Sequence, residues 1–277
     1  MKRIMVGVDG SPAAEHALVW ACRLARPSGA EVVVATTFSP SESEVSPTRY
    51  IELETAAARR LDQEWSAPAQ VEGVEFRPAL YEGEPDVLLE RADAEDSDLL
   101  VVGTRGRGGF AGLDVGSVAH HFVHHATRPL AIVPPSTELV PLERVVIGVD
   151  GSEGSAEALR WCTLALAPVA PSFIAVHAVS PPEWEDDPRR IPGLAGEKLR
   201  AWVAPLTAAG LEVIPLVEQD VHPVAALAAV TRARHAGLVV VGTRGLGGFT
   251  GLRLGRVPLQ LLHQTAVPVV MVPPHWN

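Results

Sequence analysis

Residues 98–116 read DLLVVGTRGRGGFAGLDVG, and this stretch decides the fold. Its apolar run predicts a short buried strand that ends at Gly103, where residues that tolerate positive φ begin. A helix is expected to start at Ser117, which is an N-cap residue type. The inner face of this helix would carry Val118, Phe122 and Ala126. A glycine-rich loop between a strand and a helix N-terminus can aim backbone N–H groups at one point, and this arrangement suits a phosphate chain.

The same stretch occurs twice, which indicates a duplicated domain. Residues 237–255 match residues 98–116 with 13 identities in 19 positions. The opening run RIMVGVDGS at residues 3–11 likewise recurs as RVVIGVDGS at residues 144–152. The two echoes lie 139 and 141 residues after their first copies, and this period is far longer than that of a solenoid repeat.

We therefore predict two α/β domains, residues 1–137 and residues 143–277, joined by a proline-stiffened linker. In each domain apolar β-rich runs alternate with helical patterns, which predicts a doubly wound, mostly parallel five-stranded sheet with right-handed crossovers. The strands expected in the first domain span residues 3–8, 31–37, 75–80, 99–103 and 130–133, and its helices span residues 12–25, 51–65, 85–92 and 117–126. The strands expected in the second domain span residues 145–149, 173–178, 212–217, 238–241 and 269–272.

The composition is that of an ordinary globular chain. Of the 277 residues, 47% are hydrophobic and 20% are charged, and the formal net charge is −10. A negative net charge without a local basic cluster argues against a nucleic-acid-binding surface. No apolar stretch approaches the ~18 residues of a membrane-spanning helix, and the apolar run near the N-terminus is too short for a signal peptide. Cys22 and Cys162 are expected to be reduced helix residues, so we predict a cytoplasmic protein.

Two polar features are expected at the same edge of the first sheet. Ligands bind open parallel sheets beyond the carboxyl ends of the strands, where the strand order reverses. Asp9 and Gly103 each follow a strand directly, so a ligand between neighbouring first and fourth strands would meet both a carboxylate and the glycine-rich loop. The loop suits phosphates, and the carboxylate suits a hydroxyl or amine donor of a nucleoside. One anion-binding end and one acceptor end predict a nucleotide site.

The spacing of these residues resembles a known signature. Three glycines and a hydroxyl residue, Gly103-x2-Gly106-x9-Gly116-Ser117, resemble the ATP-binding signature of the universal stress protein family. The opening strand at residues 6–11 resembles the first strand of that family, and the whole chain is similar to its tandem-domain members. The resemblance implies a Rossmann-like, adenine nucleotide alpha hydrolase-like fold that binds ATP, with or without Mg²⁺. It also implies that the two domains pair through their fifth strands into a pseudo-dimer.

The resemblance also implies site residues in the first domain. Asp9 and Thr37 would lie near the adenine and the ribose. The ribose and the triphosphate would be lined by Gly103, Gly106, Arg107, Gly116, Ser117 and Val118. In this arrangement Arg107 would neutralise charge, and the hydroxyl and amide of Ser117 would hold a phosphate oxygen. Further candidates beside these positions are Gly10, Ser11, Val102, Thr104 and Arg105.

The second copy of the signature departs from the first. Its candidate residues are Asp150, Gly151, Ala178, Gly242, Gly245, Gly255, Arg256 and Val257. Arg256 replaces the hydroxyl residue, and it would either bind phosphate as a cation or fill the pocket; Leu246 replaces Arg107. Pro258 lies in the first helical turn, where it removes one backbone donor. We therefore expect weaker or altered nucleotide binding in the second domain.

Four histidines form two i, i+4 pairs on the helix that follows the first glycine-rich loop. They are His120, His121, His124 and His125. This spacing can bind zinc, but no carboxylate or cysteine stands at a completing spacing nearby. We interpret them as helix-surface or interface histidines, with His120 and His124 pointing outward, and we expect no metal site.

Three functions fit these features. The first is a cytoplasmic ATP-binding stress-response protein that acts as a sensor or regulator. The second is an enzyme that slowly hydrolyses ATP or transfers a nucleotidyl group, using Asp9 and a bound Mg²⁺. The third is a nucleotide-free interaction module. The sequence shows no G-x-S-x-G, Walker lysine or H-E-x-x-H motif, so we favour the first function and expect no efficient catalysis; self-association into a homo-oligomer would be compatible with all three.

Overall fold

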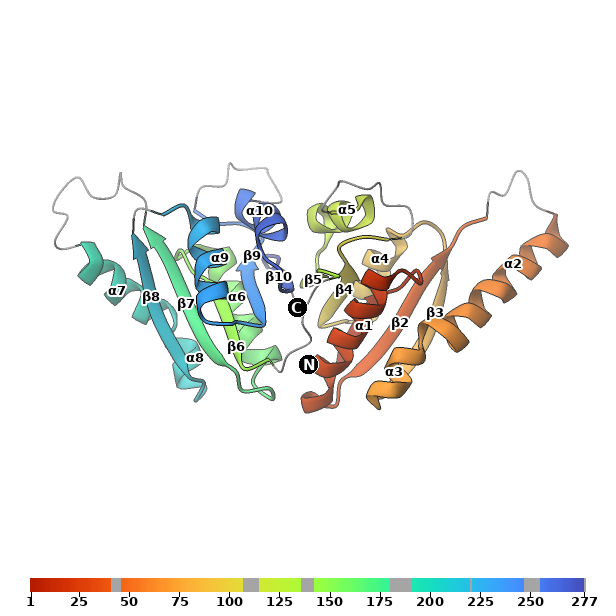
Figure 1. Cartoon of the computed structure of the whole chain (residues 1–277), viewed down its shortest axis with the longest axis horizontal. Coiled ribbons are helices and arrows are strands. Elements are labelled where there is room, and N and C mark those ends of the chain that lie inside the picture. The colour runs from red at the N-terminus through yellow and green to blue at the C-terminus, as the bar shows by residue number, and fades with distance from the viewer. Residues whose placement is uncertain are drawn as a thin grey trace. The chain divides into compact units, whose positions relative to one another are not determined.

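The structure is a computed structural model, and it describes residues 1–40, 46–106, 115–135, 142–179, 191–219, 221–246 and 255–276. The chain divides into two compact units, Met1–Pro135 and Ser136–Asn277. In each unit parallel strands form a sheet against which helices pack (Figure 1). The predicted α/β fold class is confirmed.

In the described part of the first unit, the strand order is β3-β2-β1-β4-β5, and all pairs are parallel. The strands are β1 (Arg3–Gly7), β2 (Glu31–Phe38), β3 (Phe76–Glu82), β4 (Leu99–Gly103) and β5 (Leu130–Val133). The helices are α1 (Pro12–Ala25), α2 (Pro47–Arg60), α3 (Ala67–Glu72), α4 (Val87–Ala94) and α5 (Ser117–His125), with a 3-10 turn at Arg26–Ser28 and a π-helical turn at Leu61–Trp65. The chain leaves β1 in one direction and returns to β4 on its other side, so the topological switch point lies between these two strands.

The described part of the second unit repeats this topology as β8-β7-β6-β9-β10. Its strands are β6 (Arg144–Gly148), β7 (Ser172–Val179), β8 (Val213–Gln219), β9 (Leu238–Gly242) and β10 (Val269–Val272). Its helices are α6 (Glu153–Ala165), α7 (Ile191–Trp202), α8 (Ala204–Ala208), α9 (Pro223–Ala233) and α10 (Arg256–Gln264). Every strand predicted from the sequence is present, which confirms the predicted duplication of the βαβ order.

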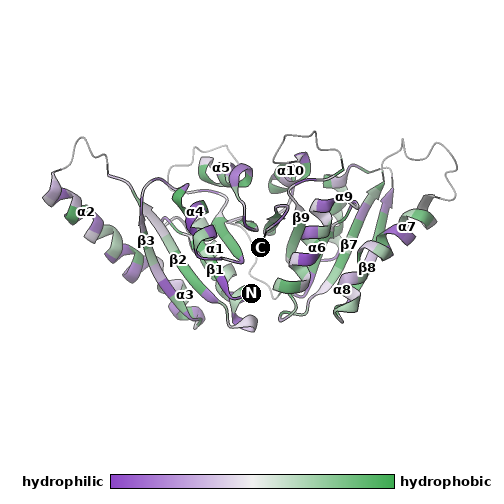
Figure 2. Cartoon of the chain, turned by 180° about the vertical axis from the view of Figure 1, so that it is seen from behind, coloured by the Kyte–Doolittle hydropathy of each residue, from purple (hydrophilic) through white to green (hydrophobic). Residues whose placement is uncertain are grey.

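The core of each unit lies on both faces of its sheet. Central strands such as β1 and β4 are continuous apolar runs, because a parallel strand covered on both faces has no solvent side to alternate with (Figure 2). Helix α1 packs against α3 and against β1 and β4, whereas α4 packs against β2, β3 and β4. Right-handed crossovers place α1 and α3 on one face of the sheet and α4 and α5 on the other. Trp20 and Trp161 are buried, so their prediction as core residues is confirmed.

The segment between β2 and β3 differs from the sequence prediction. The helix expected at residues 51–65 begins earlier, at Pro47, because the Ser46 hydroxyl caps it by accepting the amide of Arg49 at 3.3 Å. This helix ends in the π-helical turn, and α3 follows as a short helix that the sequence pattern does not predict. None of the residues of α2 is buried, and its main contacts are with the π-helical turn that follows it (Figure 1).

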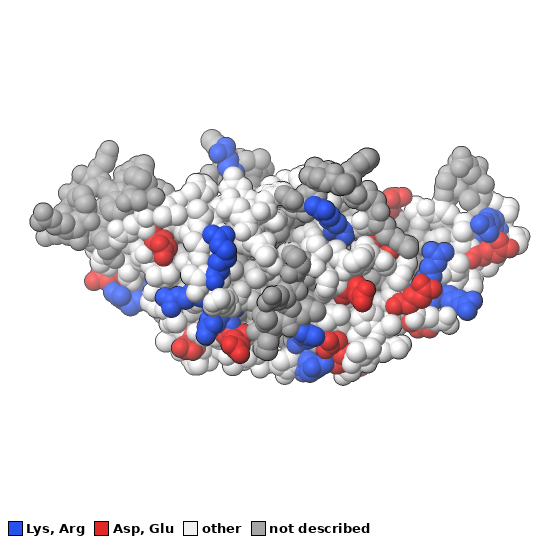
Figure 3. Space-filling view, viewed as in Figure 1, with Lys and Arg blue, Asp and Glu red and all other residues white. Residues whose placement is uncertain are grey.

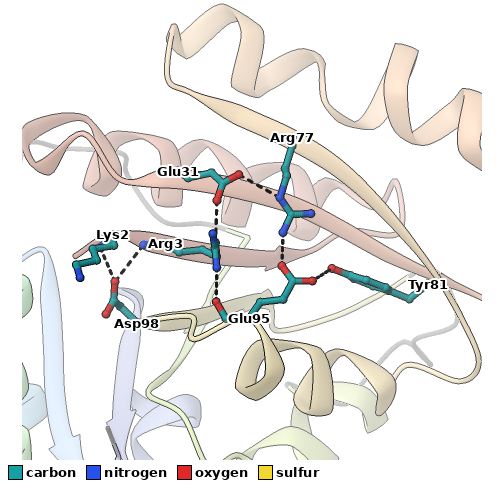
Figure 4. Close-up of polar contacts among 7 residues, drawn as sticks. All are labelled: Lys2, Arg3, Glu31, Arg77, Tyr81, Glu95 and Asp98. Atoms are coloured by element: carbon teal, nitrogen blue, oxygen red, sulfur yellow. Dashed lines mark hydrogen bonds and ion pairs between the residues drawn. The ribbon is translucent and has the colours of Figure 1, made fainter.

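A network of charged side chains joins the amino ends of the first-unit strands, at the sheet edge opposite to the switch-point rim (Figure 4). Glu31 accepts from Arg3 at 2.7 Å and from Arg77 at 3.0 Å, so one carboxylate joins the starts of β1, β2 and β3. Arg77 and the Tyr81 hydroxyl also bond to Glu95, at the end of α4. The hydrogen bond from Arg3 and the charges of both arginines lower the pKa of Glu31.

The corresponding positions of the second unit lack this network. Strand register places Arg144 opposite Ser172, and Ile214 takes the place of the second arginine on the next strand. Arg144 instead donates to the backbone carbonyl of Arg234 at 3.1 Å. The charged network is therefore a feature of the first unit alone among the residues that the structure describes.

The surface is mixed in charge, and basic side chains are interspersed with acidic ones on the face shown in Figure 3. Within the described ranges, no helix is both long and apolar enough to cross a membrane. Cys22 and Cys162 are buried free thiols on α1 and α6, as predicted. Burial raises the pKa of Cys22 to about 12 and raises the pKa of Cys162 well above its ordinary value.

Candidate functional site

A cavity of about 530 Å³ opens at the carboxyl ends of β1 and β4. These two strands pair directly. The site predicted from the sequence required the first and fourth strands to be neighbours, and they are. The volume lies within the range of about 300–1,000 Å³ that is usual for small-molecule sites. The cavity is lined by the predicted residues Asp9, Thr37, Val102, Gly103, Thr104, Arg105, Gly106, Gly116, Ser117 and Val118, and also by Gly7, Val8, Ala14, Thr36, Pro85, Leu88 and Ala119.

Asp9 stands between the end of β1 and the start of the glycine-rich loop. Its Oδ1 accepts the backbone amide of Ser11 at 2.9 Å, so the carboxylate also shapes the turn into α1. A Cβ atom on Gly106 would lie 2.5 Å from Asp9 Oδ2, which is closer than real Cβ atoms come to their neighbours, so the carboxylate would have to shift. Glycine therefore lets the loop pass this close to the carboxylate in its present position.

The glycine that ends β4 is required by packing. A Cβ on Gly103 would lie 2.7 Å from the carbonyl carbon and oxygen of Ala13, so glycine allows the end of β4 to touch the first turn of α1. Gly103, Gly106 and Gly116 tolerate positive φ, as the sequence indicates, but none of the three adopts it. Close backbone approach, rather than a left-handed conformation, explains the glycines of the signature.

Gly10 and Ser11 lie behind the cavity wall, where they support the loop. Gly10 has φ +76°, and the ring of Trp65 occupies the space that its side chain would need. The Ser11 hydroxyl accepts the amide of Ala14 at 3.2 Å and donates to the carbonyl of Arg105 at 3.3 Å. Ser11 therefore caps α1 and ties its first turn to the loop after β4.

The start of α5 faces the cavity. Gly116 is the N-cap in an extended conformation, and its amide donates to the carbonyl of Thr104 at 2.7 Å. Ser117 is thus the first helical residue, so its prediction as the N-cap is wrong by one position. The first intrahelical bond runs from the amide of His120 to Gly116, which leaves the amides of the first turn without an intrahelical acceptor. With the helix dipole, these amides form an anion-binding end.

The outcome for the predicted inner face of α5 is mixed. Phe122 is fully buried, whereas Val118 is 40% exposed and lines the cavity. The prediction that Val118 faces inward is therefore wrong, because the first turn of the helix lies at the rim, where no other element covers it. His120 and His121 are exposed, and His124 is half-buried.

Part of the cavity lining is an apolar wall that sequence reasoning missed. Pro85 comes from the turn before α4 and Leu88 from α4, while Val8 follows β1 and Ala14 belongs to α1. These residues carry no motif; only the topology could have indicated them, because the turn after β3 lies at the carboxyl edge of a parallel sheet. A cavity with both apolar and amide-lined surfaces can hold a molecule with a flat apolar part and an anionic part.

Few ionisable side chains face the described part of the cavity. Asp9 and Arg105 are the two among the lining residues, and Arg105 is half-exposed. Arg107, the predicted counter-charge of the phosphates, lies outside the described residues. In the described part of the site, backbone amides therefore supply most of the positive potential.

In the second unit, the equivalent carboxylate is occupied by donors of its own chain. Asp150 Oδ1 accepts the amide of Ser152 at 3.0 Å and its hydroxyl at 2.5 Å, while Oδ2 accepts the amide of Leu246 at 3.0 Å. Gly245 touches this carboxylate as Gly106 touches Asp9, and Gly242 lies against the backbone of Gly154. The glycine contacts of the two units are thus the same in kind.

The second unit differs at the strand that follows α6. His177 and Ala178 stand where the first unit has Thr36 and Thr37. His177 is buried, its Nδ1 lies 2.9 Å from the carbonyl of Val149 and therefore carries the proton, and its ring packs edge-on against Trp202 at 5.1 Å. Gly151 lies against the ring of the same tryptophan with φ +80°. An imidazole thus takes the place of a cavity-lining threonine.

The start of α10 offers fewer backbone donors than the start of α5. Gly255 is the N-cap, and Arg256, Val257 and Pro258 follow as the first turn. Pro258 has no N–H group, so this turn presents two free amides where α5 presents three. The exposed Arg256 stands where α5 has Ser117.

Comparison with known proteins identifies relatives along nearly the whole chain. The family described as the universal stress protein family matches residues 1–134 and 141–273. A universal stress protein of Mycobacterium tuberculosis is 28% identical over 297 residues, covering 97% of this chain and 95% of the relative. One from Mycolicibacterium smegmatis is 27% identical over 291 residues, covering 98% and 97%. The crystal structure of a universal stress protein from Archaeoglobus fulgidus shares the fold with a TM-score of 0.73 at 18% identity, covering 98% of both chains.

Proposed function

The chain belongs to the universal stress protein family, and we propose that its first unit binds an adenine nucleotide in the cavity between β1 and β4. The single observation that carries this proposal is the cavity of about 530 Å³ that joins Asp9, Thr37 and the first turn of α5. The apolar wall would receive the base, and the amides at the start of α5 would receive the phosphates.

The polar groups of the cavity suit the middle of such a ligand. Asp9 and Thr37 would accept from and donate to the ribose hydroxyls or the base, and Ser117 would donate to a phosphate oxygen. Asp9 is the one carboxylate among the described lining residues. Mg²⁺, where it accompanies ATP, would therefore be held mainly by phosphate oxygens and water rather than by a protein cage.

We propose a regulatory rather than a catalytic role for this binding. General acid–base or nucleophilic catalysis needs several groups in mutual reach, and the described lining offers only Asp9 and Arg105 as ionisable side chains. Nucleotide binding would then act through the first turn of α5, whose amides would hold the phosphates. Slow hydrolysis remains the alternative, and steady ADP release that Asp9→Ala abolishes would favour it.

The second unit would bind the same ligand weakly or not at all. Its first helical turn lacks one amide, and the buried His177 stands where the first unit has the cavity-lining Thr36. We therefore expect one nucleotide for each chain. Pairing of the two units through β5 and β10, and any homo-oligomer, stay predictions.

The test is to denature the purified chain, identify the released nucleotide and measure its stoichiometry. Gly116→Glu should abolish binding in calorimetry, because a carboxylate would enter the phosphate end of the cavity. Gly255→Glu places the same change at the same position of α10 and should leave the stoichiometry unchanged. Both variants are checked by circular dichroism. Full nucleotide occupancy in Gly116→Glu would refute the placement of the site.

A further inference from the structure

The last turns of α5 carry four imidazoles that the proposed nucleotide site does not use. His120 lies one turn before His124, and His121 lies one turn before His125. The ring centroids are 4.7 Å apart in the first pair and 4.2 Å apart in the second. All four belong to one surface of a nine-residue helix.

The two pairs differ in the direction of their rings. The rings of His121 and His125 are almost parallel, at 19°, and a metal ion cannot lie in both ring planes while they stack. The rings of His120 and His124 are tilted by 48° rather than stacked, and two imidazoles at i, i+4 on one helix face have a spacing that can bind one metal ion. His125 also donates from Nδ1 to the carbonyl of His121 at 2.8 Å, which holds it within the stacked pair.

Two carboxylates bond to residues just beyond α5. Arg128 pairs with Asp93 at 2.9 Å and with Asp96 at 2.9 Å, and Thr127 also bonds to Asp93. These carboxylates are engaged there, so His120 and His124 would bind an ion through their imidazoles alone.

We propose that the second half of α5 binds a divalent transition-metal ion, with ring nitrogens of His120 and His124 as its two protein ligands. No group of three or more metal-ligating side chains is found among the described residues, so water completes the coordination. Imidazole ligands suit Cu²⁺, Ni²⁺ and Zn²⁺, and the order of affinities places Cu²⁺ first. Mg²⁺ and Ca²⁺ prefer oxygen ligands and should not bind here.

Metal binding at this site would stabilise one helical turn of α5. An ion held by His120 and His124 links residues that are neighbours only when the segment is helical, so the ion stabilises the helix over the coil. The first turn of the same helix lines the cavity, but the metal site needs no nucleotide. Failure of the nucleotide proposal would therefore leave this inference standing.

The experiment titrates the full chain, free of any affinity tag, with CuSO₄, ZnCl₂ and MgCl₂ in a non-coordinating buffer near neutral pH. We expect calorimetry to show one Cu²⁺ per chain, weaker Zn²⁺ binding and no Mg²⁺ binding. The electron paramagnetic resonance spectrum of the Cu²⁺ complex should show two nitrogen ligands. Acidification should release the ion, because protons compete for the imidazoles.

The second unit supplies matched substitutions. Its helix α10 has Leu259, Gln260 and Gln264 where α5 has His120, His121 and His125. We expect His120→Leu to weaken Cu²⁺ binding about tenfold or more, as the loss of one of two ligands requires. The double variant His121→Gln/His125→Gln should bind as the parent does.

Three outcomes would overturn the inference. They are the absence of Cu²⁺ binding to the parent chain, unchanged binding in His120→Leu, and loss of binding in the double variant His121→Gln/His125→Gln, in which His120 and His124 are intact. His263→Gln on α10 is the control for binding by a single surface histidine and should change nothing. These side chains are exposed or half-buried on α5, and circular dichroism verifies that each variant is folded.

Discussion

The two units share one strand–loop–helix stretch but surround it with different side chains. In both, a glycine lets the end of the fourth strand touch the first helix, and a second glycine lets the loop touch an aspartate. In the first unit, Thr36 and Thr37 line a cavity beside this aspartate. In the second, His177 and Ala178 take their places, and the ring of His177 packs against Trp202. The glycines are therefore required by the packing of the fold in both units. The side chains at the positions of Thr36 and Thr37 decide what the carboxyl edge of each sheet can bind.

The largest expected effect comes from substituting the loop glycine next to the aspartate, and it distinguishes a role in packing from a role in binding. Gly106→Ala puts a Cβ 2.5 Å from Asp9 Oδ2, so the carboxylate must move toward the cavity. We expect nucleotide affinity to fall about 100-fold, which corresponds to about 2.7 kcal/mol, in isothermal titration calorimetry. Gly245→Ala creates the same clash with Asp150 and should leave the affinity unchanged. Equal losses in both variants would show that the two rims do not differ in function.

A smaller effect is expected when a second-unit residue is moved into the first. Thr36→His places an imidazole in the cavity wall, where its counterpart His177 is buried against Trp202. We expect the ring to narrow the cavity and to weaken nucleotide binding about tenfold, or about 1.4 kcal/mol. The reverse change, His177→Thr, is the control. Unchanged affinity in Thr36→His would mean that this wall does not contact the ligand.

The charged network predicts a difference in local stability between the two units. Glu31→Ser copies the second unit and leaves Arg3 and Arg77 without their shared carboxylate. Because these groups are partly exposed, we expect a loss of about 1 kcal/mol in the opening free energy of β2 and β3. Hydrogen-exchange mass spectrometry measures it peptide by peptide. Glu212→Ser, at an exposed position before β8, should have no such effect.

The smallest effect concerns acid stability. The pKa of Glu31 is lower in the folded state than its ordinary value of 4.5, because Arg3 donates a hydrogen bond to the carboxylate and both arginines attract it. Its contribution is thus fully present above pH ~4.5 and is lost as pH falls through the folded-state pKa. The parent chain and Glu31→Ser should differ in urea unfolding at neutral pH and converge in acid. If the two free energies of unfolding still differ in acid, the difference comes from packing rather than from the charge of Glu31.

Local chemistry explains which elements the sequence predicts well. Strands such as β1 and β4 are short runs of branched apolar residues, and Ser11 and Pro12 mark the start of α1, so these elements follow from neighbours in the chain. The π-helical turn and α3 have no such pattern, because contacts with other segments stabilise them: α3 packs against α1, and the π-helical turn packs against β2 and β3. The apolar wall at Pro85 and Leu88 could not be predicted for the same reason, because it arises from contacts between segments that are distant in the chain.

By itself, the sequence determined that the chain is a duplicated α/β protein with a glycine-rich loop after the fourth strand of each copy. Those conclusions rest on periodicity, spacing and internal repetition, which are properties of residues close together along the chain. Only the tertiary structure decided that Gly103 is needed for contact with Ala13, that Val118 faces a cavity, and that the amide of Leu246 bonds to Asp150. Each of these depends on distances between segments about a hundred residues apart, which arise when the sheet packs against its helices.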